Sequence, residues 1–414
     1  MRKTIKILSL LLLVALMVGN VWAADTVNLK LFFYKQEIVK QMGDLVDAFA
    51  KTNPNVKIEL EIVPNDSMTV LKTRMQSGQA PDIIQLQSYA SVFEFAEAGW
   101  LADLSKEPVM GKVVPSTKSA VTFKGKQYAL PMDVAGIGII YNKEIFEKYG
   151  LKPPTTFAQL QKVCTVLKKH GVTPFASMFR ANWSIGHFLS MAHTTLAGEK
   201  LMPWMEKMNK GQASWGDPVN KKQLFRILDF YKANSDKKAA EFDWNEQQAA
   251  FAGGKAAMMV QGLWSYGAAI STNPHLRCGF IPFPCTNSVK NTKLFADVDS
   301  TFALSATASP EKLKAAKAFI NWLSTPEAVK IWVEKCHLVP TFKGADVKSM
   351  DAPFQDLVKY LNAGKTNPWA FSMYPVNAWE DATKNGAQAY IFGTQNADQV
   401  IQYIDQVWKR EISK

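Results

Sequence analysis

The sequence predicts an α/β protein in which strands and helices alternate along the chain. The first observation is an apolar stretch from Val134 to Tyr141, which is too hydrophobic for a surface loop and too short to span a membrane. Such a run is typical of a strand buried on both faces, as in a parallel sheet covered by helices. A helix-forming segment over 143–149 follows at once and ends at Gly150.

A strand–helix–strand unit near the N-terminus indicates the same fold class. Apolar and polar residues alternate over 27–33 and again over 56–62, which is the pattern of half-buried strands. Between them, apolar residues from Ile38 to Phe49 recur at helical spacing, and Asn53-Pro54-Asn55 ends that helix. These segments form a βαβ unit, whose crossover should be right-handed.

The alternation continues towards the C-terminus. A helix, a strand and a helix are expected over 68–76, 81–86 and 91–98. Thr156 and Gln159 form a capping-box pattern that opens the next helix. Ser309 and Thr325 each precede a proline and predict two further helix starts. The last helix is expected over about 397–410.

The first residues have the pattern of a cleaved export signal. The basic residues Arg2, Lys3 and Lys6 precede an apolar segment over 7–18, and Val21-Trp22-Ala23 fits a small-x-small cleavage site. This apolar segment is shorter than the roughly 20 residues of a membrane span. Since no cysteine stands at the cleavage point, we expect 1–23 to be removed and a soluble periplasmic protein without a lipid anchor.

The cysteines and the charge exclude several classes of protein. Four cysteines in so long a chain do not indicate a disulfide framework, and Cys164 falls on the apolar face of a predicted helix. Cys278 and Cys285 flank an extended segment that reaches about 23 Å, whereas a bridge needs Cα atoms about 5.5–6 Å apart. Cys336-His337 lacks the further ligands of a zinc site. We therefore expect no metal and no cofactor.

The basic residues are scattered along the chain. The formal charge of +12 falls to +9 once the three basic residues of the signal are removed. An excess of this size could favour anionic ligands or membrane surfaces. Because the lysines stand singly or in pairs, a solvated basic surface is the favoured interpretation, and no nucleic-acid partner is expected.

Several blocks along about 390 residues together point to a known family. They cover 48–58, 78–84, 99–104, 128–151, 250–264, 280–284 and 338–341. The block over 250–264 is the most diagnostic, because a helix ends at Gly253-Gly254, a strand follows, and Trp264 stands at the strand's carboxyl end. In their order and spacing these blocks resemble extracellular solute-binding protein family 1, the maltose-binding-protein-like carbohydrate receptors of ATP-driven (ABC) importers.

The resemblance implies a two-lobed periplasmic-binding-protein fold of type II. Each lobe would hold a mostly parallel sheet flanked by helices, and three crossings at 128–151, 280–284 and 338–341 would join the lobes. The N-terminal lobe would take 25–133 and 287–338, and the C-terminal lobe 134–286 and 339–414. The implied function is capture of a mono- or oligosaccharide in the interlobe cleft by a monomer. The closed form would then dock on the importer's permease subunits.

The resemblance also implies a set of ligand-binding residues. A sugar ring has an apolar face that packs on aromatic rings and an edge of hydroxyls that bonds carboxylates and amides. Trp264 resembles the family's stacking tryptophan, and Trp183 and Trp379 stand where relatives present aromatic residues to the ligand. The polar candidates follow predicted strands or precede the crossings: Tyr34, Gln36, Glu37, Gln87, Ser88, Asp133 and Asp299.

Several of these residues have structural alternatives. Trp264 could be a core tryptophan, and Glu37 could complement the dipole of the following helix. Asp133 could be a hinge carboxylate bonded to backbone amides. Near Asp299 the chain departs from the family pattern, because it lacks the Gly-rich turn that relatives carry.

Two other classes of protein compete with a sugar receptor. Asp297 and Asp299 superficially suggest glycoside hydrolysis, but carboxylates two residues apart on one segment do not naturally flank a scissile bond. Binding of a polyamine would need several carboxylates, and iron usually needs clusters of tyrosine or histidine. The aromatic and amide-containing set favours a neutral polyol and a protein that is not an enzyme.

Overall fold

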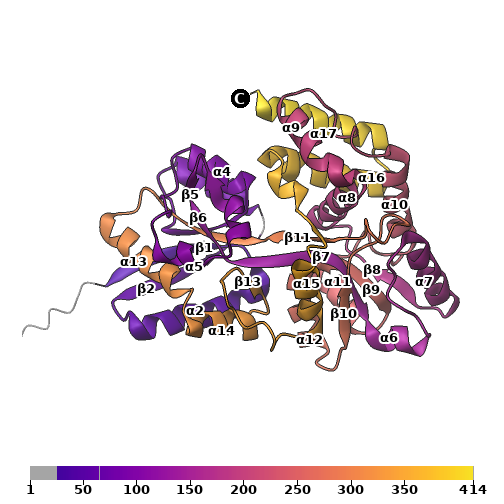
Figure 1. Cartoon of the computed structure of the whole chain (residues 1–414), viewed down its shortest axis with the longest axis horizontal. Helices are drawn as coiled ribbons and strands as arrows, with labels where there is room; N and C mark the ends of the chain where they lie inside the picture. The colour runs from indigo at the N-terminus through magenta and orange to yellow at the C-terminus, as the bar shows by residue number, and fades with distance from the viewer. Residues whose placement is uncertain (1–25, 65, 414) are drawn as a thin grey trace, which may run out of the picture.

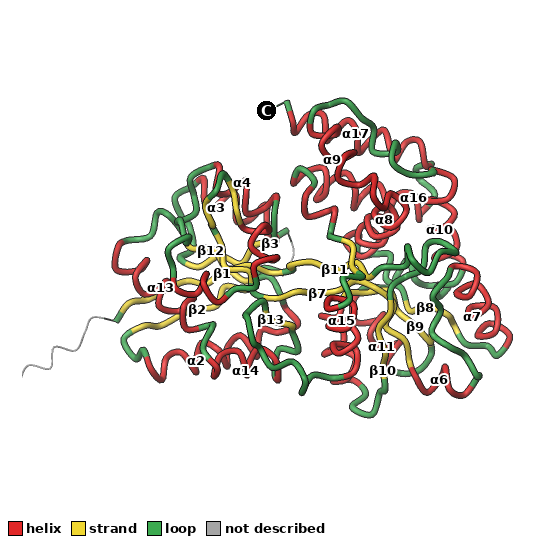
Figure 2. Tube along the Cα trace, in the orientation of Figure 1, coloured by secondary structure: helices red, strands yellow, loops and turns green. Residues whose placement is uncertain are grey.

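The protein forms two lobes that lie side by side and are connected by long strands (Figure 1). The computed structural model describes residues 26–64 and 66–413, so the predicted export signal lies outside the described residues. Figure 2 shows strands in the centre of each lobe and helices around them. The longest connection is β7 (Asp133–Asn142), which is the buried strand predicted from the sequence.

The N-terminal lobe is built on a five-stranded sheet in the order β2-β1-β3-β12-β6. Its strands are β1 (Val27–Phe33), β2 (Val56–Ile62), β3 (Ile83–Gln87), β6 (Ala129–Pro131) and β12 (Ser300–Leu304). Strand β1 runs parallel to β2 and β3, as the βαβ pattern predicts, and β12 runs antiparallel to β3 and β6. The flanking helices are α2 (Val39–Thr52), α3 (Ser67–Gln76), α4 (Ala90–Glu97), α5 (Pro108–Lys112), α13 (Pro310–Trp322) and α14 (Pro326–Glu334).

The sheet of the C-terminal lobe is centred on β7. The strands that pair with it are β9 (Ala256–Gly262), β10 (Cys278–Ile281), β11 (Leu294–Val298) and β13 (Val339–Pro340). All four of these pairs are antiparallel, and in the part of the chain that the structure describes the parallel pairs of this sheet are β8 (Thr173–Ala176) on β9 and β14 (Thr366–Asn367) on β11. The prediction of a mostly parallel sheet is therefore wrong for this lobe. An apolar run records that both faces of a strand are buried, but it does not record the direction of its neighbours.

Helices cover this second sheet on both sides (Figure 2). They are α6 (Lys143–Lys148), α7 (Phe157–Lys169), α8 (Asn182–Ala197), α9 (Leu201–Asn209), α10 (Lys221–Ala233), α11 (Trp244–Ala252), α12 (Tyr266–Thr272), α15 (Ala352–Asn362), α16 (Lys384–Phe392) and α17 (Ala397–Ile412). The predicted caps are confirmed, since the Ser309 and Thr325 side chains accept hydrogen bonds from the first turns of α13 and α14. At α7 the Thr156 side chain caps as predicted, but Gln159 accepts from the N–H of Thr155.

The chain crosses between the lobes at three places. The first lies between β6 and β7, the second at Val298–Ser300 between β11 and β12, and the third at β13. The second crossing differs from the predicted one at 280–284, because β10 and β11 both pair with β7 inside the C-terminal lobe. The predicted boundary at 286/287 thus falls too early. The proline-containing segment 280–284 has the sequence of an extended segment. Nothing in that sequence indicates that it pairs with β7, which lies about 140 residues earlier in the chain.

Each lobe has its own buried core. Among the described residues, one hydrophobic cluster fills the N-terminal lobe, and two clusters lie around the two faces of the C-terminal sheet, the second of which also includes Val333 of α14. All four cysteines are free and buried, as expected for Cys164. Within the residues that the structure describes, no helix is long and apolar enough to cross a membrane.

Candidate ligand-binding cleft

A cavity of about 330 Å³ lies between the two lobes. On the N-terminal side it is lined by η1 (Gln36–Ile38) and by residues 335–337 after α14. On the C-terminal side it is lined by η4 (Leu263–Ser265), α12 and the start of α11. Its volume is at the lower end of the range of small-molecule sites, about 300–1,000 Å³. Three predicted residues, Gln36, Glu37 and Trp264, line this cavity from opposite lobes.

Trp264 stands just beyond the carboxyl end of β9 and is half-buried. Its ring lies directly over Gly262, where an added Cβ would come within 2.2 Å of the indole. The absence of a side chain at Gly262 therefore leaves the space that the Trp264 ring occupies in the wall of the cavity. The indole also makes an edge-to-face contact with Trp369, at 6.0 Å between ring centroids.

The three predicted tryptophans converge on one imidazole, that of His187. Its ring centroid lies 5.7 Å from that of Trp183, 5.9 Å from Trp264 and 5.2 Å from Trp379, onto which it stacks with an interplanar angle of 18°. Trp379 is only 3% exposed and also stacks on Phe371. The residues that were predicted as separate candidates thus form one aromatic cluster in the C-terminal lobe.

This aromatic cluster contains polar atoms without partners. Burial, followed by the charge of Lys384, lowers the pKa of His187 to about 3, so its imidazole is neutral. Among the described residues, neither Nδ1 of His187 nor Nε1 of Trp379 has a hydrogen-bond partner. Buried polar groups are normally paired, and such unpaired groups call for a partner. Neither His187 nor Trp379 lines the cavity of about 330 Å³, so these two atoms leave unused hydrogen-bonding capacity inside the cluster, behind Trp264.

Two of the predicted carboxylates lie at the crossings. Asp133 is fully buried, and its Oδ1 accepts hydrogen bonds from the N–H of Ser300, at 3.2 Å, and from the Ser300 hydroxyl. Asp299 forms an ion pair with Lys35, whose Nζ also lies 3.5 Å from Oδ2 of Asp133. Neither carboxylate lines the cavity of about 330 Å³. This placement matches the alternative of a hinge carboxylate for Asp133.

The remaining polar candidates lie at the carboxyl ends of β1 and β3. Tyr34 donates its N–H to Gln85 at 3.0 Å, while its buried hydroxyl has no partner among the described residues. Gln87 is half-buried and pairs with β12 through its backbone. Ser88 is buried and donates its hydroxyl to the carbonyl of Val298 at 2.7 Å, which ties β3 to the second crossing.

The electrostatics of this region are dominated by burial. Burial raises the pKa of Glu37 to about 7, although Lys35 opposes the shift. Burial also raises the pKa of Asp133 to about 6, again against the effect of Lys35. For Lys35 itself, burial alone would lower the pKa, but Asp133 and Asp299 outweigh it, and the pKa lies well above its usual value. The ammonium group is therefore charged at neutral pH.

Sequence reasoning missed two residues of this region, Lys35 and His187. Lys35 stands between the predicted residues Tyr34 and Gln36, but a lysine after a strand is ordinarily solvated, and its partner Asp299 is 264 residues away. His187 lies four residues after Trp183 on α8, so the two side chains share a helix face. That spacing was a usable signal for His187, whereas none was available for Lys35.

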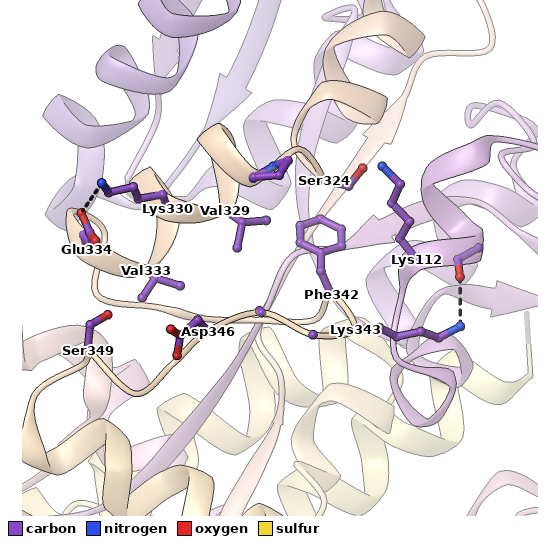
Figure 3. A pocket seen from close by; sticks show the side chains of 14 residues that line it. Lys112, Ser324, Val329, Lys330, Val333, Glu334, Phe342, Lys343, Asp346 and Ser349 are labelled. Atoms are coloured by element: carbon purple, nitrogen blue, oxygen red, sulfur yellow. Dashed lines mark hydrogen bonds and ion pairs between the residues drawn. The ribbon is translucent and has the colours of Figure 1, made fainter.

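A larger pocket of about 600 Å³ lies elsewhere (Figure 3). It is formed by α5, α14 and the segment 342–349 that follows the third crossing. Its charged groups are partly paired, with Lys330 4.0 Å from Glu334 and Lys343 donating to the carbonyl of Gly111 at 3.0 Å. None of the ten predicted ligand-binding residues lines it.

Comparison with known proteins identifies the class to which this fold and cleft belong. Residues 34–330 match the model of the bacterial extracellular solute-binding proteins, and the chain belongs to that family. Among its relatives is the multiple sugar-binding protein of Streptococcus mutans, which is 26% identical over 349 residues, 83% of this chain and 82% of the relative. The melibiose/raffinose/stachyose-binding protein MelE of Bacillus subtilis is 22% identical, and the match covers 86% of this chain and 84% of the relative.

Solved structures show the same two-lobed fold. The solute-binding protein RafE in complex with raffinose has a TM-score of 0.82 at 21% identity, and the match covers 94% of this chain and all of that one. A chitin oligosaccharide binding protein has a TM-score of 0.81 at 22% identity, with the same coverage. The prediction of a periplasmic-binding-protein fold with two α/β lobes is thereby confirmed.

Proposed function

We propose that this protein is the sugar-binding component of an ABC importer, and that it captures a mono- or oligosaccharide between its lobes. The observation that carries the proposal is the composition of the cleft. Trp264 lines the cleft on the C-terminal side and contacts the His187 ring of the aromatic cluster, whose Trp183 and Trp379 do not line the cavity. Gln36 and Glu37 line the cleft on the N-terminal side. Aromatic faces on one wall and hydroxyl-binding groups on the other match the two chemistries of a sugar.

Capture requires no chemical step. Rings of the aromatic cluster pack on the apolar face of the sugar, and Gln36 and Glu37 bond its hydroxyls from the other lobe. Because such a ligand contacts both lobes, it binds the closed form more tightly and shifts the hinge equilibrium towards closure. The unpartnered Tyr34 hydroxyl and Trp379 Nε1 are further ligand contacts in this scheme. Ser88, Asp133 and Asp299 act through the crossings, and Gln87 borders them.

The cellular setting follows from the same proposal. The exported chain, freed of residues 1–23, works as a periplasmic monomer without a lipid anchor and delivers its sugar to the permease subunits of the inner membrane. The relatives support a sugar as the cargo, since they include proteins named for binding of multiple sugars, maltotriose and melibiose.

A hydrolase is less well supported. Asp297 accepts hydrogen bonds from the Tyr89 hydroxyl and the N–H of Trp369, both at 3.1 Å, while Asp299 is paired with Lys35. Each carboxylate is thus engaged by different structural partners, and neither lines the interlobe cavity in which a glycosidic bond would have to lie between two carboxyl groups.

A polyamine receptor is likewise less well supported. Among the described residues, Glu37 is the only carboxylate that lines the cavity, and the basic residue Lys335 lines it as well. A cationic ligand would therefore find one negative charge balanced by one positive charge. A neutral polyol fits this lining better.

Two measurements test the proposed function. Mass spectrometry of small molecules released from the purified and denatured protein should detect a saccharide. Tryptophan fluorescence should then change on titration with that saccharide, and with none of a panel of polyamines. Release of a polyamine, or a saturable response to polyamines alone, would contradict the proposal.

A further inference from the structure

The three crossings between the lobes meet at Asp133. The backbone of Asp133 pairs with that of Pro340 in the third crossing. Its carbonyl accepts a hydrogen bond from the N–H of Asp299 at 3.0 Å, and its side chain accepts from both the N–H and the hydroxyl of Ser300, so three hydrogen bonds join it to the second crossing. Asp133 itself begins β7, directly after the first crossing. One fully buried residue therefore holds all three connections together.

Lys35 compensates the charge at this meeting point. It is the only buried lysine among the described residues, with 4% of its surface exposed. Its Nζ pairs with Asp299 of the second crossing and lies 3.5 Å from Oδ2 of Asp133, an oxygen that has no hydrogen-bond partner. Without this ammonium, two carboxylates would face each other in a buried site. Removal of one partner from such a network leaves an uncompensated buried charge, which is strongly unfavourable.

The same lysine directly precedes two residues of the cleft wall. Lys35 is the residue that precedes η1, and the next two residues, Gln36 and Glu37, line the interlobe cavity. The backbone of Lys35 thus continues into η1, while its side chain pairs with Asp133 and Asp299 at the first and second crossings. If the hinge moves Asp299, Lys35 must move with it or lose its ion pair. Movement of Lys35 would displace the turn that carries Gln36 and Glu37.

We propose that Lys35 is a positioning residue that locks the first and second crossings together and fixes the angle between the lobes. It does so through Asp133 and Asp299, without contact to the ligand. The triad couples the N-terminal wall of the cleft to the hinge, so that ligand contacts at this wall and the lobe angle change together. This inference concerns the hinge of the ligand-free protein and does not depend on which solute is bound.

The interlobe distance of the ligand-free protein tests the proposal. Spin labels are attached to cysteines introduced at Lys57 of β2 and Lys222 of α10, which are exposed residues on different lobes. The four native cysteines are free and buried, but Cys336 lines the interlobe cavity and is therefore replaced by serine in the parent and in every variant. We expect Lys35→Met to add longer interlobe distances that are absent from the parent protein, as measured by double electron–electron resonance.

A matched control is Lys317→Met. Lys317 pairs with Glu107 at 2.8 Å inside the N-terminal lobe, with side-chain exposures of 33% and 14%, and this pair does not reach a crossing. We expect this variant to keep the parent distance distribution. If Lys35→Met folds, as judged by its circular dichroism spectrum, and keeps the parent distribution, the proposal is overturned. The same holds if Lys317→Met broadens the distribution as much as Lys35→Met does.

Asp299→Asn keeps the proposal testable if Lys35→Met does not fold. This change frees the second crossing from the ammonium but leaves Lys35 with Asp133, so a smaller broadening is expected. The double variant should be no broader than Lys35→Met alone, because both changes break the same unit. An unchanged distribution in Asp299→Asn, or additive broadening in the double variant, would count against a positioning role.

Discussion

Trp264 carries the main apolar contact of the proposed site. Trp264→Ala should weaken sugar binding by about 2–4 kcal/mol, as expected for a buried aromatic anchor, or roughly 30- to 1,000-fold in Kd. Because the ring is half-buried and lies over Gly262, its removal should leave the fold largely intact. Isothermal titration with the sugar released from the protein measures the affinity, and thermal melting measures the stability.

A core tryptophan provides the control for this prediction. Trp332 on α14 is 2% exposed and belongs to the core of the N-terminal lobe. Trp332→Ala should cost about 3–5 kcal/mol of folding stability, with little effect on the affinity of the folded fraction. The stacking role is refuted if Trp264→Ala behaves like Trp332→Ala and loses stability but keeps its affinity.

Glu37 should make stability depend on pH. Its pKa is raised from 4.5 to about 7, mainly by burial, with Lys35 opposing and Asp299 and Asp133 adding to the shift. Between these two values the folded protein binds more protons than the unfolded chain, so the free energy of unfolding falls as pH rises. Above pH 7 the effect levels off. Glu37→Gln removes this contribution.

Denaturant unfolding of the parent and of Glu37→Gln at pH 5 and pH 8 measures the effect. Groups common to both proteins, including Asp133, cancel in the difference. We expect Glu37→Gln to gain stability over the parent on going from pH 5 to pH 8. A difference that is constant across this range would show that the Glu37 carboxylate titrates near its ordinary pKa.

Individual residues of the candidate site were predictable only where a recognisable pattern in the adjacent sequence placed them. Gln36 and Glu37 follow a clear strand, and Trp264 ends a diagnostic block, and all three line the cavity. Lys35 has no such signal, because its burial depends on two carboxylates that are distant in sequence. Asp133 was expected near the cleft, but whether it faced ligand or hinge depended on Ser300, which pairs with it only in the folded chain.

At the scale of elements, the glycines of β7 determine how closely its neighbours approach. A Cβ on Gly138 would lie 2.4 Å from the carbonyl oxygen of Ile281 on β10, and this backbone atom cannot move aside cheaply. Gly138→Ala should therefore destabilise the protein by about 1–3 kcal/mol or more. A Cβ added to Gly43 in α2 would have no atom within 4 Å, so Gly43→Ala should stabilise by about 0.5–1 kcal/mol.

Urea unfolding of the two variants gives this comparison directly. Both changes add one methyl group, so any difference between them reports the local space and the backbone conformation. A Gly138→Ala protein as stable as the parent would mean that β10 can move away from β7 without loss.

Elements were predictable where local chemistry specifies them. Ser309 and Thr325 open their helices as the Ser/Thr-Pro pattern predicts, because capping involves atoms only three residues apart. The direction of strands around β7 was not predictable, since antiparallel partners such as β10 and β11 come from far along the chain. For the same reason the second crossing was predicted at 280–284, whereas it lies at Val298–Ser300.

At the scale of the whole molecule, the two lobes were implied by the order of sequence blocks and not by any single one. Apart from Val333 of α14, which packs into a cluster of the C-terminal lobe, the lobes have separate cores, so the crossings and the cleft are the main connections between them. The hinge therefore combines short backbone connections with the buried triad of Lys35, Asp133 and Asp299. The cleft instead presents polar and aromatic side chains, such as Gln36 and Trp264, to solvent or to a ligand. This division allows the lobes to move as rigid bodies.

Ligand binding should accordingly act on the entire molecule. If the sugar contacts Glu37 on one lobe and Trp264 on the other, it binds the folded and closed form and not the unfolded chain. At a free sugar concentration of 100 Kd, the free energy of unfolding should then rise by about 2.7 kcal/mol, and Tm should increase with sugar concentration.

Small-angle scattering at saturation should show a smaller radius of gyration than that of the ligand-free protein, unless the ligand-free lobes are already closed. Spin labels at positions 57 and 222 distinguish that case, because they report the ligand-free distance independently. A rise in Tm with unchanged scattering and an open ligand-free distance would mean that the sugar binds one lobe alone, and the interlobe cleft would then not be the site.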